Sequence, residues 1–425
     1  MTTHRRGLLA GLGLTTLAAA APAVAQTPPA AAPKPPLADR LAARAAEHRW
    51  PVNFTGGRAS GPGVDRLIEE GKAARFFLLG EEHGLAEVPA LVATLMPALK
   101  PAGYTRLGLE VSPSAALALD AAASGGLDGI RDFYRTGPRA LAFYTMLEEA
   151  RMLADLRGAF PGEAPLCFGL DYEVIGDRLL IEALAAKAPA SARAPLAALD
   201  TASKAGWAKY DTTKNLSDIL PFSGDPDLVR AVRAAWPNPD AASEDILETL
   251  EQTLVINQHQ TAQRYFLSND VRARFNRANW VRFWATEGRR KQPPRALLKF
   301  GAGHMVRGRS MTEVYDIGSL ISETAALRGE TSFHLLVIPL NGRQAYLDGK
   351  TLTYAQTEAS TVAEMGLEPI ARAALGSGST LIDLRPLRAL MPGSVTRTAD
   401  ANLSRVVHGF DALLLVRDST ASTNL

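Results

Sequence analysis

Residues 75–84 read RFFLLGEEHG and combine an apolar run of strand length with a charged end. The apolar half has no polar alternation, which is typical of a strand that is covered on both faces. The run then ends in a glycine, two glutamates and a histidine, residue types that are common in catalytic and ligand-binding sites. The stretch therefore predicts a buried strand with a candidate site at its end.

Six further apolar runs resemble this one and are separated by turn residues and by longer segments with helical spacing. The seven expected strands are Arg75–Leu79, Leu107–Val111, Leu166–Leu170, Arg295–Phe300, Phe333–Pro339, Thr380–Leu384 and Ala412–Val416. Strands that alternate with helices usually build a parallel sheet. We therefore expect an α/β fold with a mostly parallel central sheet flanked by helices.

The region from Val174 to Gly288 breaks this alternation. It is rich in Ala, Leu, Arg and Asp, and it follows helical spacing with few strand signals. We predict a helical insertion or cap at about residues 174–288, which would shape a substrate pocket.

The composition excludes one class of partner. The chain has 425 residues, of which 47% are hydrophobic and 21% are charged, so a large core can form. The formal net charge is +2 and no long basic run occurs. Because nucleic-acid binders carry a basic patch or stripe, we expect no nucleic-acid partner.

The N-terminus has the pattern of an export signal. An apolar stretch from Gly7 to Ala21 follows Arg5-Arg6, and Ala23-Val24-Ala25 supplies a small-residue cleavage site. The stretch is shorter than the roughly 20 residues of a membrane-spanning helix, so an uncleaved anchor is the weaker alternative. The arginine pair favours the twin-arginine route, although such pairs also occur in ordinary signal peptides.

Three segments follow from this pattern: a signal peptide at residues 1–25, a Pro/Ala-rich linker at 26–36 and a folded domain at 37–425. The only cysteine, Cys167, lies far from the signal peptide, so the sequence offers neither a lipid-acylation cysteine nor an intramolecular disulfide. We expect a periplasmic or secreted protein with no membrane contact after cleavage.

Acidic residues and histidines follow four of the expected strands. Glu81 and His83 follow the first run, and Glu110 ends the second. Asp171 and His304 follow the runs at 166–170 and 295–300. The carboxyl ends of parallel strands line one crevice. We therefore expect a catalytic group that consists of Glu81, His83, Glu110 and His304.

The two histidines share a Gly-x-x-His spacing, in turns expected at Gly80–His83 and Gly301–His304. A neutral imidazole can take a proton from water, while a nearby carboxylate holds its tautomer and stabilises the imidazolium. A second imidazole can polarise the attacked carbonyl or protonate the leaving group. Because no Gly-x-Ser-x-Gly motif occurs, the pattern favours histidine-activated water over a serine nucleophile.

The same side chains could instead bind a metal, because imidazole and carboxylate are normal ligands of zinc and manganese. The sequence has neither His-Glu-x-x-His nor a pair of cysteines, so we expect no metal and no other cofactor. A binding module in which both histidines ligate a metal or haem is the rival interpretation.

Five further side chains are candidates for substrate binding: Glu87, Asp171, Tyr172, Arg272 and Arg274. Each has a structural alternative, namely an acid that complements a helix dipole, a turn at a strand end, or a solvated basic helix face. Four other histidines lack comparable neighbours and are expected to be structural: His48, His259, His334 and His408.

The string from Leu79 to Glu87 resembles the Gly-Glu-x-x-His-Gly-x-x-Glu signature of the erythromycin esterase family. Further stretches resemble motifs of that family in the same order: Leu109-Glu110, the helix Leu147–Arg157, Gly169–Asp171, the helix segment Phe275–Asn279, the turn Ile317–Leu320, and the closing strands around Ile382–Arg385 and Phe410–Ala421. The resemblance covers most of the mature chain.

The resemblance implies hydrolysis of a macrolactone ester by histidine-activated water without a required metal. It also implies that Glu81, His83, Glu110 and His304 form the catalytic group. The esterases usually have His-x-x-His in the later motif, whereas this chain has Gly301 as its first member. The Gly-x-x-His form is more similar to related members of the broader superfamily, which includes haem-binding ChaN-like lipoproteins and Tiki/TraB-type metalloproteases.

We therefore expect an exported hydrolase that cleaves an ester or related acyl bond of a small molecule. His83 would be the general base, oriented by Glu81, while Glu110 and His304 would position water or substrate. The alternatives are a metal- or haem-binding ChaN-like protein, a Tiki/TraB-type metallohydrolase, and a structural or interaction protein with a decayed site.

Overall fold

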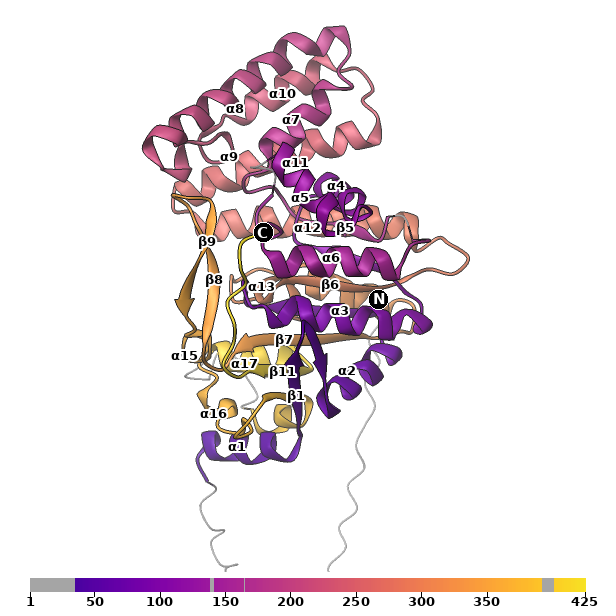
Figure 1. Ribbon diagram of the computed structural model, residues 1–425, viewed down its shortest axis with the longest axis vertical. Coiled ribbons are helices and arrows are strands. Elements are labelled where there is room, and N and C mark those ends of the chain that lie inside the picture. The colour runs from indigo at the N-terminus through magenta and orange to yellow at the C-terminus, as the bar shows by residue number, and fades with distance from the viewer. Residues whose placement is uncertain (1–34, 138–140, 164, 392–400) are drawn as a thin grey trace, which may run out of the picture. The chain divides into compact units, whose positions relative to one another are not determined.

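A nine-stranded sheet forms the centre of the protein. The computed structural model describes residues 35–137, 141–163, 165–391 and 401–425. The strand order is β2-β1-β10-β11-β7-β3-β6-β4-β5. Figure 1 labels several of these strands between the helices. The strands are β1 Arg49–Thr55, β2 Arg58–Ser60, β3 Phe76–Glu81, β4 Tyr104–Leu109, β5 Cys167–Gly169, β6 Arg295–Gly301, β7 Ser332–Pro339, β10 Ser379–Asp383 and β11 Ala412–Val416.

Most of the sheet is parallel. Strands β11, β7, β3, β6, β4 and β5 pair in parallel, whereas β10 is antiparallel to β11 and β1 is antiparallel to β10 and β2. The seven expected strands are all present, and the expected α/β fold is confirmed. Strands β1 and β2 are not predicted from the sequence, because they are short or interrupted by Pro51 and are only partly buried.

Two strands extend further than the sequence suggests. Strand β3 includes Gly80 and Glu81, and β6 includes Gly301, so the prediction that both Gly-x-x-His segments are turns is wrong for their first residues. Glu81 pairs with Gly301 in the parallel ladder between β3 and β6. This register places the two histidine-bearing segments next to each other at one edge of the sheet.

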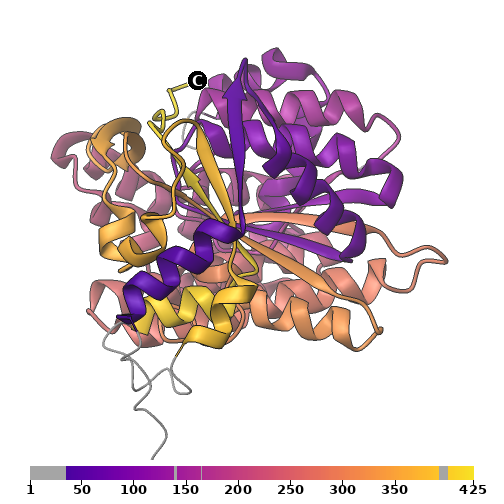
Figure 2. The ribbon, with the colours of Figure 1, turned by 90° about the horizontal axis from the view of Figure 1, so that it is seen from below.

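Helices cover both faces of the sheet, as Figure 2 shows. One face packs on α2 (Pro62–Ala73), α3 (Glu87–Leu99), α4 (Pro113–Ala123), α5 (Gly126–Thr136) and α6 (Leu147–Ala159). The other face packs on α1 (Leu37–Glu47), α13 (Ala302–Met305), α14 (Ile317–Ala326), α15 (Thr361–Glu364), α16 (Glu368–Ala371) and α17 (Ala401–Gly409). Side chains alternate between these layers along each strand: Leu297 of β6 enters the first core, and Leu298 enters the second.

Only helices, and no strands, lie between Asp177 and Glu287; two short 3-10 helices accompany the α-helices. The α-helices are α7 (Asp177–Ala185), α8 (Arg193–Thr213), α9 (Leu220–Ser223), α10 (Pro226–Ala235), α11 (Ala241–Thr261) and α12 (Tyr265–Glu287). Helices α7–α11, which we call the helical lobe, share a core of their own that includes Leu199, Val229 and Leu250. Helix α12 returns to the sheet, where Trp280 packs edge-on against Phe76.

A two-stranded hairpin connects the end of β3 with the helical lobe (Figure 1). It consists of β8 (Arg343–Asp348) and β9 (Thr353–Glu358), whose polar sequences do not predict strands. The N–H of Ala345 donates to the carbonyl of Gly84 at 3.0 Å, and the hydroxyl of Tyr210 in α8 donates to the carbonyl of Lys350 at 2.8 Å. Gly84 has a φ of 85°, and a Cβ there would lie 2.0 Å from the Ala345 carbonyl oxygen, so the contact requires glycine.

The N-terminal segments predicted from the sequence are only partly described. The expected signal peptide and the linker as far as residue 34 lie outside the described residues, and helix α1 begins at Leu37. Within the described ranges, none of the helices has the length and apolarity that a membrane span requires. Export therefore stays a prediction from the sequence.

Candidate active site

Neighbouring strands deliver the expected catalytic group to one edge of the sheet. Glu81 is the last residue of β3, Glu110 directly follows β4, and His304 lies in α13 directly after β6. His83 lies in the turn after β3. Because β3, β6 and β4 are adjacent and parallel, their carboxyl ends lie side by side, and the four side chains come together.

His83 lies between two glutamates. Its Nδ1 is 2.8 Å from Glu81 Oε1, and its Nε2 is 3.5 Å from Glu110 Oε2. Both carboxylates are buried, whereas 30% of the His83 side chain is exposed. Burial lowers the pKa of His83, but Glu110 and Glu81 outweigh it and raise this pKa above its ordinary value. The carboxylate of Glu81 favours the tautomer with a proton on Nδ1, so Nε2 is the basic nitrogen of the neutral ring.

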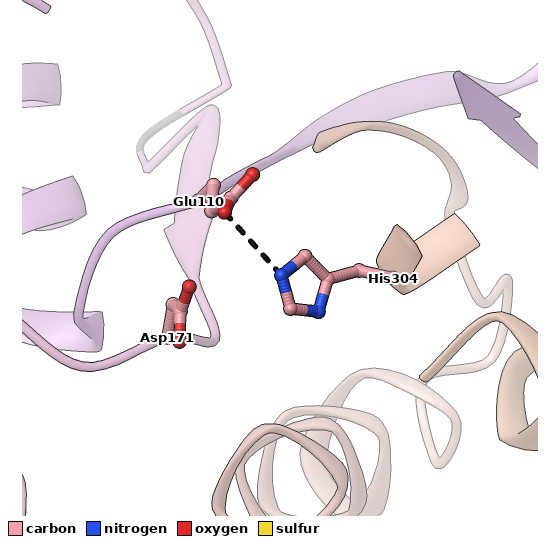
Figure 3. A group of neighbouring side chains, drawn as sticks. All are labelled: Glu110, Asp171 and His304. Carbon is pink, nitrogen blue, oxygen red and sulfur yellow. Dashed lines mark ion pairs between the residues drawn. The ribbon is translucent and has the colours of Figure 1, made fainter. Parts of the chain in front are cut away.

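His304 also lies between two carboxylates. Its Nδ1 is 2.7 Å from Asp316 Oδ2, and its Nε2 is 3.5 Å from Glu110 Oε1 (Figure 3). Asp316 is held in turn by the N–H of Ile317, where it caps the start of α14. Burial and the charge of Arg272 lower the pKa of His304, but Asp316 and Glu110 raise it to about 10. This histidine is therefore an imidazolium at neutral pH, with an N–H on each nitrogen.

Glu110 connects the two imidazoles. Oε1 accepts a hydrogen bond from Arg272 Nη2 at 2.7 Å, and Oε2 accepts one from the backbone N–H of Gly301 at 2.5 Å. Burial raises the pKa of Glu110, but His83, His304 and Arg272 reverse that effect and hold it well below its usual range. The buried Glu110 is consequently an anion that several donors and cations compensate.

Arg272 of α12 reaches the same edge and joins two acidic side chains. Its Nε donates to Asp171 Oδ1 at 3.0 Å, and its Nη2 donates to Asp171 Oδ2 and Glu110 Oε1. The ring of Tyr172 lies 4.9 Å from the guanidinium carbon. Only 22% of the Arg272 side chain is exposed, so a solvated basic face is the wrong description for this residue. Its hydrogen bonds position carboxylates of the site.

Two of the expected substrate-binding residues, Arg274 and Glu87, make their polar contacts with residues outside the group around Glu110. Arg274 is 69% exposed and pairs with Asp270 one helical turn earlier. Glu87 is buried at the start of α3, where Oε1 accepts the N–H of Thr420 at 2.9 Å. Both arrangements match the structural alternatives for these residues, a solvated helix face and an acid in the first turn of a helix.

A buried ion-pair chain behind His83 is not predicted from the sequence. Lys299 Nζ in β6 lies 2.8 Å from Glu81 Oε1 and 2.7 Å from Glu149 Oε1 in α6. Burial raises the pKa of Glu149 to about 7, whereas Lys299 and His83 overcome burial and lower the pKa of Glu81. One feature of the sequence could have indicated these ion pairs: a lysine stands inside the apolar run Leu297-Leu298-Lys299-Phe300. Buried lysines are rare without an acidic partner.

The described side chains fit a metal-free site better than a metal site. Glu110, Asp171 and His304 each offer a potential ligand atom within 4.8 Å of the others (Figure 3). The guanidinium of Arg272 already bonds both of these carboxylates, so a cation between them would face a fixed positive charge.

Gly301 lies directly beside His83. A Cβ at this position would lie 3.0 Å from His83 Nε2 and 3.4 Å from Glu110 Oε2. The first distance is shorter than ordinary van der Waals contact, so any side chain here would crowd the imidazole. Solvent reaches the His83 side chain, which is 30% exposed.

Comparisons with known proteins identify the fold. Neither the protein-family models nor the curated sequences contain a match. A solved structure from Bacillus cereus matches with a TM-score of 0.60 and 14% identity, covering 91% of this chain and 99% of that one. A mutant of erythromycin esterase EreC in its open conformation matches with a TM-score of 0.60 and 14% identity, covering 88% and 99%. A succinoglycan biosynthesis protein matches with a TM-score of 0.55 and 12% identity, covering 90% and 98%.

These similarities extend over nearly the full length of each matched structure. The resemblance to the erythromycin esterase family seen in the sequence motifs is thereby confirmed at the level of the fold. At 12–14% identity the similarity concerns the fold alone, because one fold hosts many functions. The activity has to be argued from the site.

We predict that Lys299→Met lowers the free energy of unfolding by roughly 3–5 kcal/mol, because it leaves buried carboxylates without their cation. Adding Glu149→Leu should recover part of this loss, since it removes one of the two carboxylates that have lost their cation. Urea denaturation measures both effects. The control is Lys204→Met, which breaks an ion pair whose lysine is 65% exposed and should change stability by about 0–1 kcal/mol. Equal losses for Lys299→Met and Lys204→Met would contradict the prediction.

Proposed function

We propose that this protein hydrolyses an ester or a related acyl bond with water activated by His83. One observation carries the proposal: Glu81 holds Nδ1 of His83 at 2.8 Å, while the ring stays 30% exposed beside Gly301, which has no side chain to crowd Nε2. A partly exposed imidazole with a carboxylate on its far nitrogen is suited to take a proton from water. The fold shared with an erythromycin esterase supports a hydrolase.

The reaction starts with a water molecule beside Nε2 of His83. This nitrogen accepts a proton as the water oxygen adds to the carbonyl carbon, and the carboxylate of Glu81 stabilises the imidazolium. The N–H on Nε2 of His304 stabilises the oxygen that becomes negative in the tetrahedral intermediate. When the bond to the leaving oxygen breaks, that oxygen takes the proton gained by His83, and an acid and an alcohol are released.

Different surroundings give the two histidines different roles. His304 has a pKa of about 10 because two carboxylates face its two nitrogens, so it serves as a hydrogen-bond donor. The pKa of His83 is also raised, because Glu110 and Glu81 outweigh burial. The His83 side chain is 30% exposed against 13% for His304, so His83 is the ring that meets water and serves as the base. Glu110 orients the water between the two rings, and Arg272 keeps Glu110 in place.

The substrate we propose is a small ester-like molecule bound between the sheet edge and the helical lobe. Helix α12 supports this assignment, since it follows the lobe directly and carries Arg272 into the site. The N-terminal 25 residues support action after export to the periplasm or the medium.

A metal-dependent hydrolase is the second candidate. Both imidazoles direct Nε2 toward Glu110 and carry a carboxylate on Nδ1, which is the usual second partner of a metal-bound histidine. Against it stands the hydrogen bond from Arg272 to Glu110. Removal of metal separates the candidates, because only a metal-dependent enzyme would lose its activity.

We expect the purified mature protein to hydrolyse at least one member of a panel of esters and lactones. His83→Gln should lower kcat by roughly 100-fold or more, because it removes the general base. Dialysis against a chelator should leave turnover unchanged, and elemental analysis should find no bound metal. Equal turnover by the parent protein and His83→Gln would end the proposal, and restoration of chelated enzyme by a divalent metal would favour the second candidate.

The pH dependence of kcat/KM should show a rise followed by a fall. Activity rises as pH increases through the pKa of His83, which lies above 6.5, because only the neutral ring accepts a proton. Activity falls near pH 10 as His304 loses its proton and its donor on Nε2. Initial rates measured from pH 5 to pH 11 test this, with His304→Gln as the control that should lack the alkaline fall. A rate already declining at pH 7 would contradict the assigned roles.

Gly301→Ala should lower kcat by roughly 10-fold or more, because its Cβ would lie 3.0 Å from His83 Nε2 and push the imidazole out of position. The matched control is Gly303→Ala in the same segment, where a Cβ would meet nothing within 4 Å. This control should keep nearly full activity. Kinetics and thermal unfolding of both variants give the comparison, and equal kcat values would contradict the need for glycine beside His83.

A further inference from the structure

Phe143 has an unusual backbone conformation in the segment before α6. Its φ is 64°, in the left-handed region that aromatic residues rarely adopt. The N–H of Tyr144 donates to the carbonyl of Ala142 at 2.8 Å, which closes a three-residue turn centred on Phe143. Turns of this kind with positive φ are rare and strained. Strain of this sort persists only where surrounding contacts hold it in place, and it is concentrated at functional sites.

The ring of Phe143 lies on the imidazole of His83. The two ring centroids are 4.3 Å apart and the planes are inclined by 21°, so the rings are stacked. The hydrogen bond to Glu81 restrains one edge of the imidazole, and the stacked ring restrains its plane. An aromatic face also attracts a cation, so the stack favours the imidazolium that forms when His83 accepts a proton.

Contacts from three parts of the protein hold Phe143. Its N–H donates to the hydroxyl of Tyr354 in β9. Its side chain packs against the core under the sheet, against the hairpin cluster with Ala345, and against a cluster with Trp207 of α8 in the helical lobe. The strained turn is therefore fixed by contacts with both the hairpin and the lobe, next to His83.

We propose that Phe143 is a positioning residue that fixes the ring plane of His83 and connects it to the packing of the helical lobe. The proposal rests on the proposed function in so far as His83 is the general base. Phe143 acts through His83 and makes no bond to the reacting atoms. The lobe, which would surround the substrate, thereby reaches the base through a single aromatic side chain.

The test compares Phe143→Gly with Phe143→Tyr. Glycine accepts the positive φ without strain, so the first variant removes the ring while the turn can still form. The tyrosine variant keeps the ring. We expect Phe143→Gly to lower kcat by roughly 100-fold with KM nearly unchanged, and Phe143→Tyr to keep kcat within about 3-fold, because a misplaced catalytic group loses rate while substrate contacts remain. The control is Phe222→Ala, which loosens the same lobe cluster at another side chain and should leave kcat nearly unchanged.

A second measurement does not depend on activity. The order parameter of the His83 ring, measured by ¹³C NMR relaxation, should fall in Phe143→Gly and stay at the parent value in Phe143→Tyr. A parent protein that hydrolyses no ester refutes the proposed function, while the ring order still decides whether Phe143 positions His83. An unchanged ring order in Phe143→Gly, a rise in KM at constant kcat, or an equal loss of kcat in Phe222→Ala would each overturn the proposal.

Discussion

The buried carboxylate of Glu110 is the group on which the site depends. An ion in a protein interior is tolerated only when donors and opposite charges surround it, and here they come from three segments: His83 after β3, His304 and Gly301 at the end of β6, and Arg272 in α12. Each of these segments is placed by the parallel sheet or by the helix that leads back from the lobe. The sheet register and the charge balance of the site therefore require each other.

Much of the fold, and the central residues of the site, could be predicted from the sequence. The apolar runs predict seven of the nine strands of the sheet, and acids or histidines at the ends of some of them predict the group around Glu110. Helix-borne and loop-borne partners could not be predicted in this way. Asp316, Glu149 and Phe143 reach the histidines and Lys299 only through tertiary packing, which leaves no local pattern. Strands β8 and β9 could not be predicted either, because their polar sequences carry no apolar strand pattern.

The two imidazoles show how alike motifs acquire unlike chemistry. Both follow a glycine by three residues and both have a carboxylate on Nδ1. The carboxylate of His83 is shared with Lys299, whereas that of His304 is shared with a backbone N–H at the start of α14. A cation opposes the increase in pKa at each ring, Lys299 at His83 and Arg272 at His304. The two rings differ in exposure, 30% for His83 and 13% for His304, so their surroundings distinguish them although their motifs are alike.

Strand β6 carries Lys299 and Gly301 on one face of the sheet and Leu298 and Phe300 on the other. Side chains alternate with a period of two residues, so insertion or deletion of a single residue within β6 would exchange these faces. The phenyl ring of Phe300 would then stand against Glu81, and a charge would enter the apolar core around Phe76. An insertion or deletion in a loop or in the helical lobe would leave these two faces of β6 unchanged.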